Sequence, residues 1–141
     1  MAQTAPILVA EDEETDVLLL QIALKKAGLA TELIVARDGQ EAVDYLSSAA
    51  VPPGLLLLDL KMPRLNGFDV LAWLETRPEL KSLPVVVLSS SSLDTDTHKA
   101  LAMGAREYLV KPHGLQALVQ LLQDVHARYL CSGAVPAVTA G

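Results

Sequence analysis

The segment "LLLLDLKMPRLNG" at residues 55–67 decides the fold. Its four successive leucines predict a strand over 54–59 that is buried on both faces, as in a parallel sheet covered by helices on both sides. The strand ends in Asp59, and Pro63, Asn66 and Gly67 then mark a turn and the start of a helix. A carboxylate in that position either caps the turn or belongs to a functional site. Which role Asp59 has depends on the polar residues that follow the other strands.

The rest of the chain repeats the strand-then-helix pattern four more times. Further strands are predicted at 6–10, 31–36, 84–89 and 106–110, and helices at 14–27, from 38 to about 48, from 66 to about 74, 94–103 and 114–129. We expect Asp38 and Glu41 to form a capping box, and Asp94 to cap the fourth helix. Right-handed crossovers then predict an α/β fold, a doubly wound five-stranded parallel sheet of order 2-1-3-4-5, which is the flavodoxin-like order.

Length and composition set the class of protein. The 141 residues are 51% hydrophobic, which predicts one folded domain over 5–130. The tail at 131–141 has no hydrophobic period, and we expect it to be disordered. A net charge of −6 disfavours nucleic-acid and membrane binding. The single cysteine, Cys131, and the absence of a signal peptide or a long apolar run predict a cytoplasmic protein with no membrane span.

Polar residues follow four of the predicted strands. Glu11 and Asp12 follow the first, Asp59 ends the third, Ser89 ends the fourth and Lys111 follows the fifth. Because ligands of such sheets bind beyond the carboxyl ends of the strands, we expect these side chains to meet at one edge. Clustered carboxylates repel one another, and an oxygen-only set of ligands favours Mg²⁺ as the ion that relieves the repulsion.

The same set of residues suits phosphoryl transfer. A carboxylate that is left free beside Mg²⁺ can attack phosphorus and form an aspartyl phosphate. Lys111 and Ser89 would then neutralise two of the phosphoryl oxygens. The chain contains no GxxxxGK[ST] sequence, so we expect no nucleotide or other organic cofactor to be bound by a phosphate loop.

Four motifs carry a resemblance to a known family. They are "AEDE" (10–13), "LLDLKMPRLNG" (57–67), "VVLSSSS" (86–92) and "YLVKP" (108–112), with 30 residues from Asp59 to Ser89 and 22 more to Lys111. Together they resemble a response-regulator receiver domain of the CheY type, over residues 6 to about 128. "VVVLSSSS" and the long last helix are similar, more finely, to stand-alone regulators that are paired with bacterial phytochromes.

The resemblance implies a role for each carboxylate and for one carbonyl group. Asp59 would be the phosphoacceptor and one metal ligand. Asp12 would bind Mg²⁺ directly, Glu11 would bind it through water, and Lys61 would supply its backbone carbonyl. Glu11 stands where an aspartate is frequent, and the Lys61 side chain borders the phosphoryl group, so the lifetime of the aspartyl phosphate is open.

The resemblance also implies a switch. Ser89 and Lys111 would hold the phosphoryl group, with Ser89 in place of the more frequent threonine. The Lys111–Pro112 peptide bond would be cis, which proline permits. Tyr108 would change its rotamer when Ser89 moves, although an aromatic residue in an edge strand can equally be ordinary packing.

The implied function is that of a single-domain response regulator in a two-component phosphorelay. The phosphoryl donor would be a sensor histidine kinase, of the phytochrome type by the finer resemblance, or a His-containing phosphotransfer protein, and the helix at 14–27 would be its docking face. The output would be phosphorylation-dependent contact with a downstream protein or a homodimer through the 94–130 face, where Leu121, Tyr129 and Leu130 are extra apolar positions. The chain would not be an enzyme beyond Mg²⁺-dependent self-phosphorylation and autodephosphorylation.

Two other classes of function remain open at this point. A receiver-like scaffold could keep the fold and signal by binding alone, without phosphorylation. A flavodoxin-like enzyme with a small cofactor would need phosphate-cradling glycines and an aromatic slot at the strand ends, and the sequence shows neither.

Overall fold

The computed structural model describes residues 5–130. Its sheet contains β1 (Ile7–Ala10), β2 (Leu33–Ala36), β3 (Leu55–Leu58), β4 (Val85–Ser89) and β5 (Glu107–Val110). All four strand pairings are parallel, and the order is β2-β1-β3-β4-β5. The predicted fold class and strand order are confirmed, whereas Cys131 and the tail, which we predicted to be disordered, lie outside the described residues.

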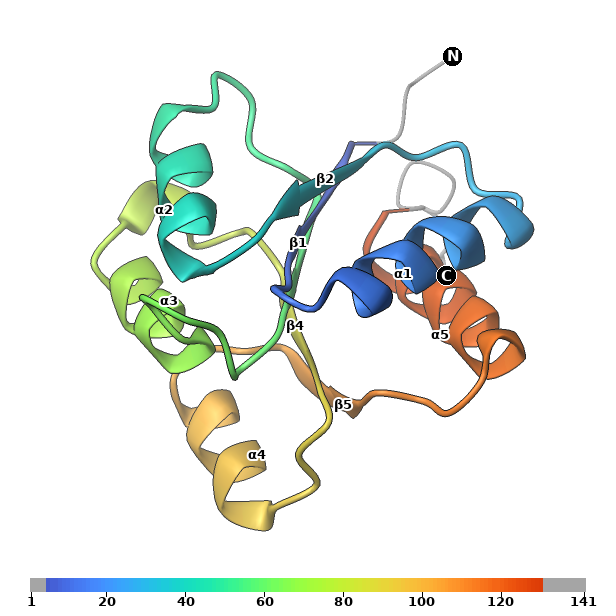
Figure 1. Cartoon of the computed structure of the whole chain (residues 1–141). Coiled ribbons are helices and arrows are strands. Elements are labelled where there is room, and N and C mark those ends of the chain that lie inside the picture. The colour runs from blue at the N-terminus through green and yellow to red at the C-terminus, as the bar shows by residue number, and fades with distance from the viewer. Residues whose placement is uncertain (1–4, 131–141) are drawn as a thin grey trace, which may run out of the picture.

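Five helices cover the two faces of the sheet. They are α1 (Glu14–Lys26), α2 (Gly39–Ser48), α3 (Gly67–Glu75), α4 (Asp94–Ala102) and α5 (Leu115–Tyr129), and a short 3-10 helix, η1 (Pro78–Leu80), follows α3. Figure 1 shows α1 and α5 together on one face, and α2, α3 and α4 on the other. The sequence pattern predicted every one of these elements except η1.

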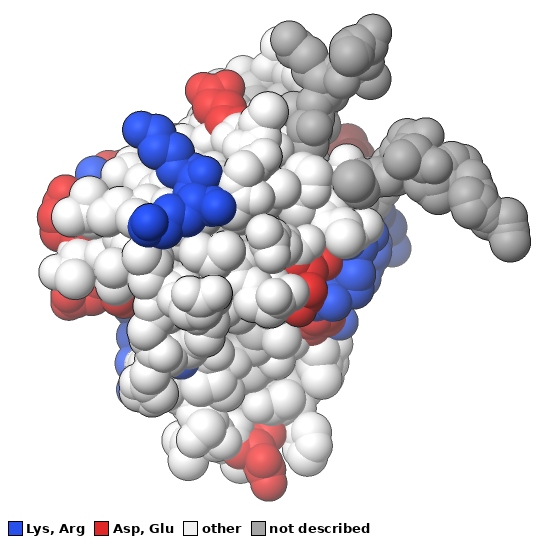
Figure 2. Space-filling model, turned by 90° about the vertical axis from the view of Figure 1, so that its right-hand side faces the viewer, with Lys and Arg blue, Asp and Glu red and all other residues white. Residues whose placement is uncertain are grey.

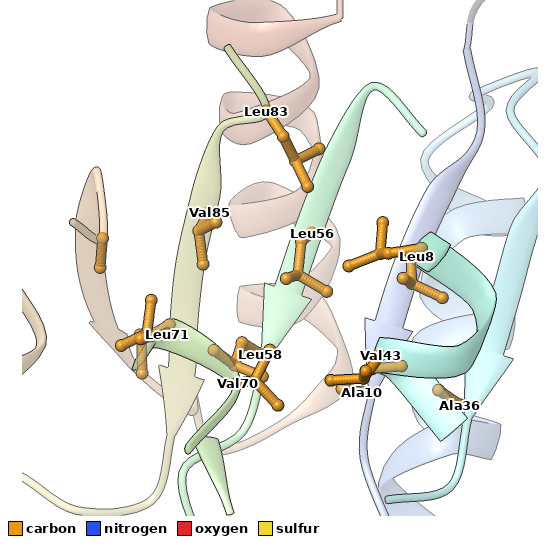
Figure 3. Packing of buried hydrophobic residues seen from close by; sticks show 14 of the residues in the cluster. Leu8, Ala10, Ala36, Val43, Leu56, Leu58, Val70, Leu71, Leu83 and Val85 are labelled. Carbon is orange, nitrogen blue, oxygen red and sulfur yellow. The ribbon is translucent and has the colours of Figure 1, made fainter. Parts of the chain in front are cut away.

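Alternation along the central strands divides the core into two layers. In β3, Leu56 and Leu58 point into the layer under α2 and α3, while Leu55 and Leu57 point into the layer under α1 and α5. All four side chains are completely buried. Figure 3 shows the first layer, in which Leu56 and Leu58 lie between residues of α2 and α3 such as Val43 and Val70. The leucine run of the opening segment is therefore required by burial on both faces.

The helix ends differ in detail from the predictions. Asp38 accepts a hydrogen bond from the Glu41 amide at 2.8 Å, as expected, but the Glu41 side chain bonds to the amide of Arg37 and so completes no box. A reciprocal capping box forms instead at α3, between Asn66 and Asp69.

The prediction that Asp94 caps α4 is wrong. Leu93 occupies the N-cap position without a side-chain hydrogen bond, and Asp94 is the first helical residue. Its carboxylate there faces the positive end of the helix dipole, which favours an acid in the first turn without a capping bond.

Candidate metal and phosphoryl site

The predicted site residues lie directly beyond the strands at one edge of the sheet. The backbone continues the sheet by one residue there: the Glu11 amide donates to the Ala36 carbonyl at 2.9 Å and the Asp59 amide donates to the Ala10 carbonyl at 3.0 Å. The Lys111 amide likewise donates to the Ser89 carbonyl at 2.8 Å. These bonds fix the backbone of the site residues to the rigid sheet.

Three carboxylates meet at this edge. Glu11, Asp12 and Asp59 each offer an oxygen atom, and these atoms lie within 4.8 Å of one another. Glu11 and Asp59 are buried, with 2% and 6% exposure, whereas Asp12 is exposed. The three residues that the sequence assigned to the metal are thus brought together.

The electrostatics of this cluster disfavour full ionisation. Burial, with the nearby Glu11 charge adding to it, raises the pKa of Asp59 from its usual 3.8 to about 7, although Lys111 opposes the shift. Burial also raises the pKa of Glu11, against its hydrogen bonds to Lys111 and the Glu13 amide. A divalent cation would remove this repulsion, and a set of oxygen donors alone fits Mg²⁺.

Lys111 supplies the positive charge at the site. Its Nζ lies 2.8 Å from Glu11 Oε1, 2.7 Å from Asp16 Oδ2 and 3.8 Å from Asp59 Oδ1. Burial works against its charge, but the hydrogen bonds to Asp16 and Glu11 outweigh burial and raise the pKa of Lys111. The ammonium group therefore stays charged beside the proposed phosphoacceptor.

The Lys61 side chain is exposed at the mouth of the site. Together with Asp12, Met62 and Asn66 it lines a hollow that opens above the acidic cluster. Its position beside Asp12 agrees with a residue that borders an incoming phosphoryl group. Its role as a carbonyl ligand stays a prediction.

Ser89 is linked to the following loop by hydrogen bonds. Ser89 is completely buried, and its Oγ accepts a bond from the Ser91 amide at 3.2 Å. Ser91 Oγ in turn donates to Asp96 of α4 at 2.7 Å, and the Ser91 carbonyl accepts from the Tyr108 hydroxyl at 2.8 Å. One residue, Ser91, thus connects Ser89, α4 and the aromatic ring that we expect to act as the switch.

The predicted cis peptide bond is wrong for this structure. Residues 5–130 contain no cis peptide bond, so the Lys111–Pro112 bond is trans. The trans isomer is the lower-energy form of an X–Pro bond.

The turn after Asp59 is fastened to α2. Arg64 adopts a left-handed conformation (φ 65°) and its guanidinium group contacts both carboxylate oxygens of Asp38, at 2.9 and 3.2 Å. The Gly39 amide donates to the Leu65 carbonyl at 3.1 Å, and the Gly67 amide donates to the Leu60 carbonyl at 2.9 Å. The "KMPRLNG" turn is therefore fixed by contacts with the start of α2 and by a hydrogen bond between its own two ends.

Sequence reasoning missed two residues of the site, Asp16 and Ser91. Asp16 lies in the first turn of α1, four positions after Asp12, and helical spacing could have placed it near the acidic pair. Ser91 is one of four consecutive serines, and only the folded loop distinguishes it from Ser90 and Ser92.

The apolar surface lies elsewhere than predicted on the 94–130 side. Leu121, Tyr129 and Leu130 are half-buried and pack against the core layer of α1 and α5. The exposed apolar residues of this side are instead Leu93, Val110 and Leu101, which are 62%, 47% and 43% exposed. They lie on or beside α4 and β5, next to the strand that carries Tyr108.

A second apolar surface lies on α1. Leu18, Leu19 and Ile22 are exposed there. Figure 2 shows the side of the molecule that is on the right in Figure 1, where uncharged residues cover most of the surface and charged residues stand in separate groups. No helix within residues 5–130 is long and apolar enough to span a bilayer.

Comparisons with known proteins found similar sequences over most of the chain. The family model described as "Response regulator receiver domain" matches residues 7–123. Response regulator Rcp1 of Synechocystis sp. is 35% identical over 136 residues, which cover 93% of this chain and 92% of Rcp1. Polar-differentiation response regulator DivK of Brucella abortus is 26% identical over 121 residues, which cover 86% of this chain and 95% of DivK.

Solved structures show the same similarity. The phosphorylated cyanobacterial phytochrome response regulator RcpA superposes with a TM-score of 0.84 at 33% identity, covering 94% of this chain and 98% of RcpA. The Mn²⁺-bound form of Rcp1 superposes with a TM-score of 0.80 at 34% identity, covering 94% and 99%.

Proposed function

The chain belongs to the response regulator receiver domain family, and from this membership we propose that Asp59 accepts a phosphoryl group in a two-component phosphorelay. One observation supports the proposal above all others. The oxygens of Glu11, Asp12 and Asp59 lie within 4.8 Å of one another, and the Lys111 ammonium lies 3.8 Å from Asp59. A buried carboxylate with a metal-type cluster and a cation beside it is equipped to become an aspartyl phosphate.

The donor in this proposal is a phosphohistidine of a histidine kinase or a phosphotransfer protein. An Asp59 oxygen attacks phosphorus, and the O–P bond forms as the P–N bond breaks; the bonding electrons return to the imidazole nitrogen, which takes a proton from water. Glu11, Asp12, Asp59 and the Lys61 carbonyl would hold Mg²⁺, which when bound neutralises one phosphoryl oxygen. Lys111 and Ser89 hold the other two, and later attack by water on phosphorus would restore Asp59 and release phosphate.

The output of the proposed switch runs through Ser91. A phosphoryl group that draws Ser89 inward pulls on the Ser91 amide, and the bonds from Ser91 to Asp96 and Tyr108 carry this shift to α4 and β5. The α4, β5 and α5 face then selects a downstream protein or a second copy of the chain. The names of the relatives RcpA and Rcp1 support a stand-alone regulator that is served by a phytochrome-type kinase.

The test combines a small phosphodonor with mass spectrometry. With Mg²⁺ and acetyl phosphate, the protein should gain the mass of one phosphoryl group, and Asp59→Asn should gain none. Asp44→Asn, which removes an exposed carboxylate on α2, is the control and should be phosphorylated normally. The absence of any mass gain in the unmodified protein, with binding of partners intact, would establish the phosphorylation-independent scaffold instead.

A panel of purified, radiolabelled histidine kinases then identifies the donor. The cognate kinase should transfer its label to this chain faster than the other kinases do. Equal, slow transfer from all kinases would contradict a dedicated kinase partner.

A further inference from the structure

The Lys111 ammonium group, which we expect to contact a phosphoryl group on Asp59, is hydrogen-bonded to other carboxylates instead. Lys111 Nζ lies 2.7 Å from Asp16 and 2.8 Å from Glu11, within hydrogen-bond distance of both. It lies 3.8 Å from Asp59, which is beyond hydrogen-bond distance. Two of its three N–H donors are therefore occupied by residues other than the proposed phosphoacceptor.

We propose that Asp16 is a positioning residue that holds the Lys111 ammonium away from Asp59 and releases it when a phosphoryl group arrives. This inference rests on the proposed function. It assigns to α1 a control over how readily Asp59 becomes modified. Asp16 would oppose modification, because its contact with Lys111 stabilises the unmodified protein alone.

Of the two carboxylates bonded to Lys111, Asp16 is the more exposed and can therefore release it more easily. Its side chain is 33% exposed, whereas that of Glu11 is 2% exposed. Lys111 would move toward a phosphoryl group that carries about two negative charges. Water would then hydrate the released Asp16 carboxylate, so losing the ion pair would cost little free energy. Glu11 is buried, so water cannot replace Lys111 as its partner as readily, and this disfavours its release.

Asp16 also stands apart from the residues that would bind the metal. Its carboxylate is not among the three that cluster within 4.8 Å. The small hollow beside Lys111 is lined by Glu11 and Asp16 as its acids, and otherwise by apolar residues such as Leu19, Leu88 and Pro112. Removing the charge of Asp16 therefore weakens one of the two contacts that hold Lys111 away from Asp59, without removing a metal ligand.

The test measures the affinity for beryllofluoride, a non-covalent mimic of the phosphoryl group, at saturating Mg²⁺. Asp16→Asn should bind the mimic about threefold to tenfold more tightly than the unmodified protein, because Lys111 no longer has to break an ion pair with Asp16 to reach the mimic. Glu14→Gln is the matched control. It makes the same change in net charge on the same helical turn, but Glu14 pairs with Arg37, so its affinity should stay within about twofold.

Other results would overturn the inference. Weaker binding by Asp16→Asn would show that Asp16 presents Lys111 to the phosphoryl group, and unchanged binding would show that the contact has no role. A second readout needs no variant: the NMR signal of the Lys111 ammonium in the unmodified protein should show contact with Asp16 at rest and lose it when the mimic is added. Retention of that contact in the complex would contradict release.

The result for the unmodified protein separates this inference from the proposed function. If it does not bind beryllofluoride even with Mg²⁺, the phosphoacceptor function itself falls. If it binds the mimic and only the effect of Asp16→Asn is missing, the function stands and the role of Asp16 falls.

Discussion

The Asp59 carboxylate lies in surroundings that oppose a negative charge. Burial and the Glu11 carboxylate raise its pKa to about 7, so in the metal-free protein the group holds its proton to far higher pH than in an unfolded chain, where it titrates near 3.8. The folded state thus binds this proton more tightly than the unfolded state. The resulting stability is present in full below about pH 4 and is lost as the pH rises through 7.

This linkage gives a prediction for Asp59→Asn. In EDTA at pH 8 the variant should be more stable than the unmodified protein by about 1–3 kcal/mol, because it has no charge to bury. At pH 5 the two proteins should differ much less. Urea unfolding at both pH values measures the difference, with Asp44→Asn as an exposed control; an equal gain at both values would contradict the assigned pKa.

The residues of the site differed in how well the sequence predicted them. Glu11 and Asp59 follow strongly apolar strands, and Lys111 follows the less buried fifth strand. The strand-end rule for parallel sheets brings the three together without further information. Asp16 and Ser91 were missed because their roles depend on where a helix turn and a loop place one particular oxygen. Side-chain geometry of this kind has no counterpart in hydrophobic periodicity.

At the scale of elements, continuous apolar runs predicted the strands and their order. The core requires Leu56 and Leu58 on one face and Leu55 and Leu57 on the other, which only a central strand can satisfy. Caps were less predictable, because near some helix starts, such as those of α1 and α4, more than one acid is available to the same amides. At α3 the cap is formed by Asn66 and Asp69, and at α4 no side chain takes the role.

The start of α3 yields a prediction for Gly67. A Cβ atom there would lie 2.5 Å from the Asp59 carbonyl oxygen and 2.8 Å from the Leu60 Cα, both backbone atoms that cannot turn aside. Gly67→Ala should therefore cost about 1–3 kcal/mol of stability and weaken Mg²⁺ binding, because the turn that carries Asp59 must shift. Thermal unfolding and calorimetric titration with Mg²⁺ measure the two effects.

Gly54→Ala is the control for that variant. Its added Cβ would meet the side chains of Ala5 and Leu130, at the other edge of the sheet. It should leave Mg²⁺ affinity unchanged whatever it does to stability. Gly67→Ala with normal Mg²⁺ affinity would mean that the turn can relax without moving Asp59.

At the scale of the whole molecule, the exposed apolar residues near α4 and β5 lie beside the end of the proposed switch. Val110 is the last residue of β5. It pairs in the sheet with the buried Ser89 but is itself 47% exposed. A surface of this kind suits a contact that forms only after a change of shape. It is the surface through which we propose that two copies associate.

Charge placed on this surface should prevent association. With Mg²⁺ and beryllofluoride the protein should form a dimer, and Val110→Lys should weaken that dimer by at least about tenfold, because a lysine ammonium would have to leave water at the interface. Light scattering after gel filtration measures the mass. Val51→Lys, at a more exposed position outside this face, should dimerise normally; if it fails too, net charge rather than the surface is responsible.

The two loops that flank the site are attached to different helices. Arg64 and Leu65 tie the turn after Asp59 to α2, while the loop on the other side of the site is tied chiefly through Ser91. In the proposed switch, a movement of the site would therefore be transmitted toward α4 rather than toward α2. A fluorescent reporter for this protein therefore belongs near α4, and a fusion partner can be joined near α2 without silencing the signal.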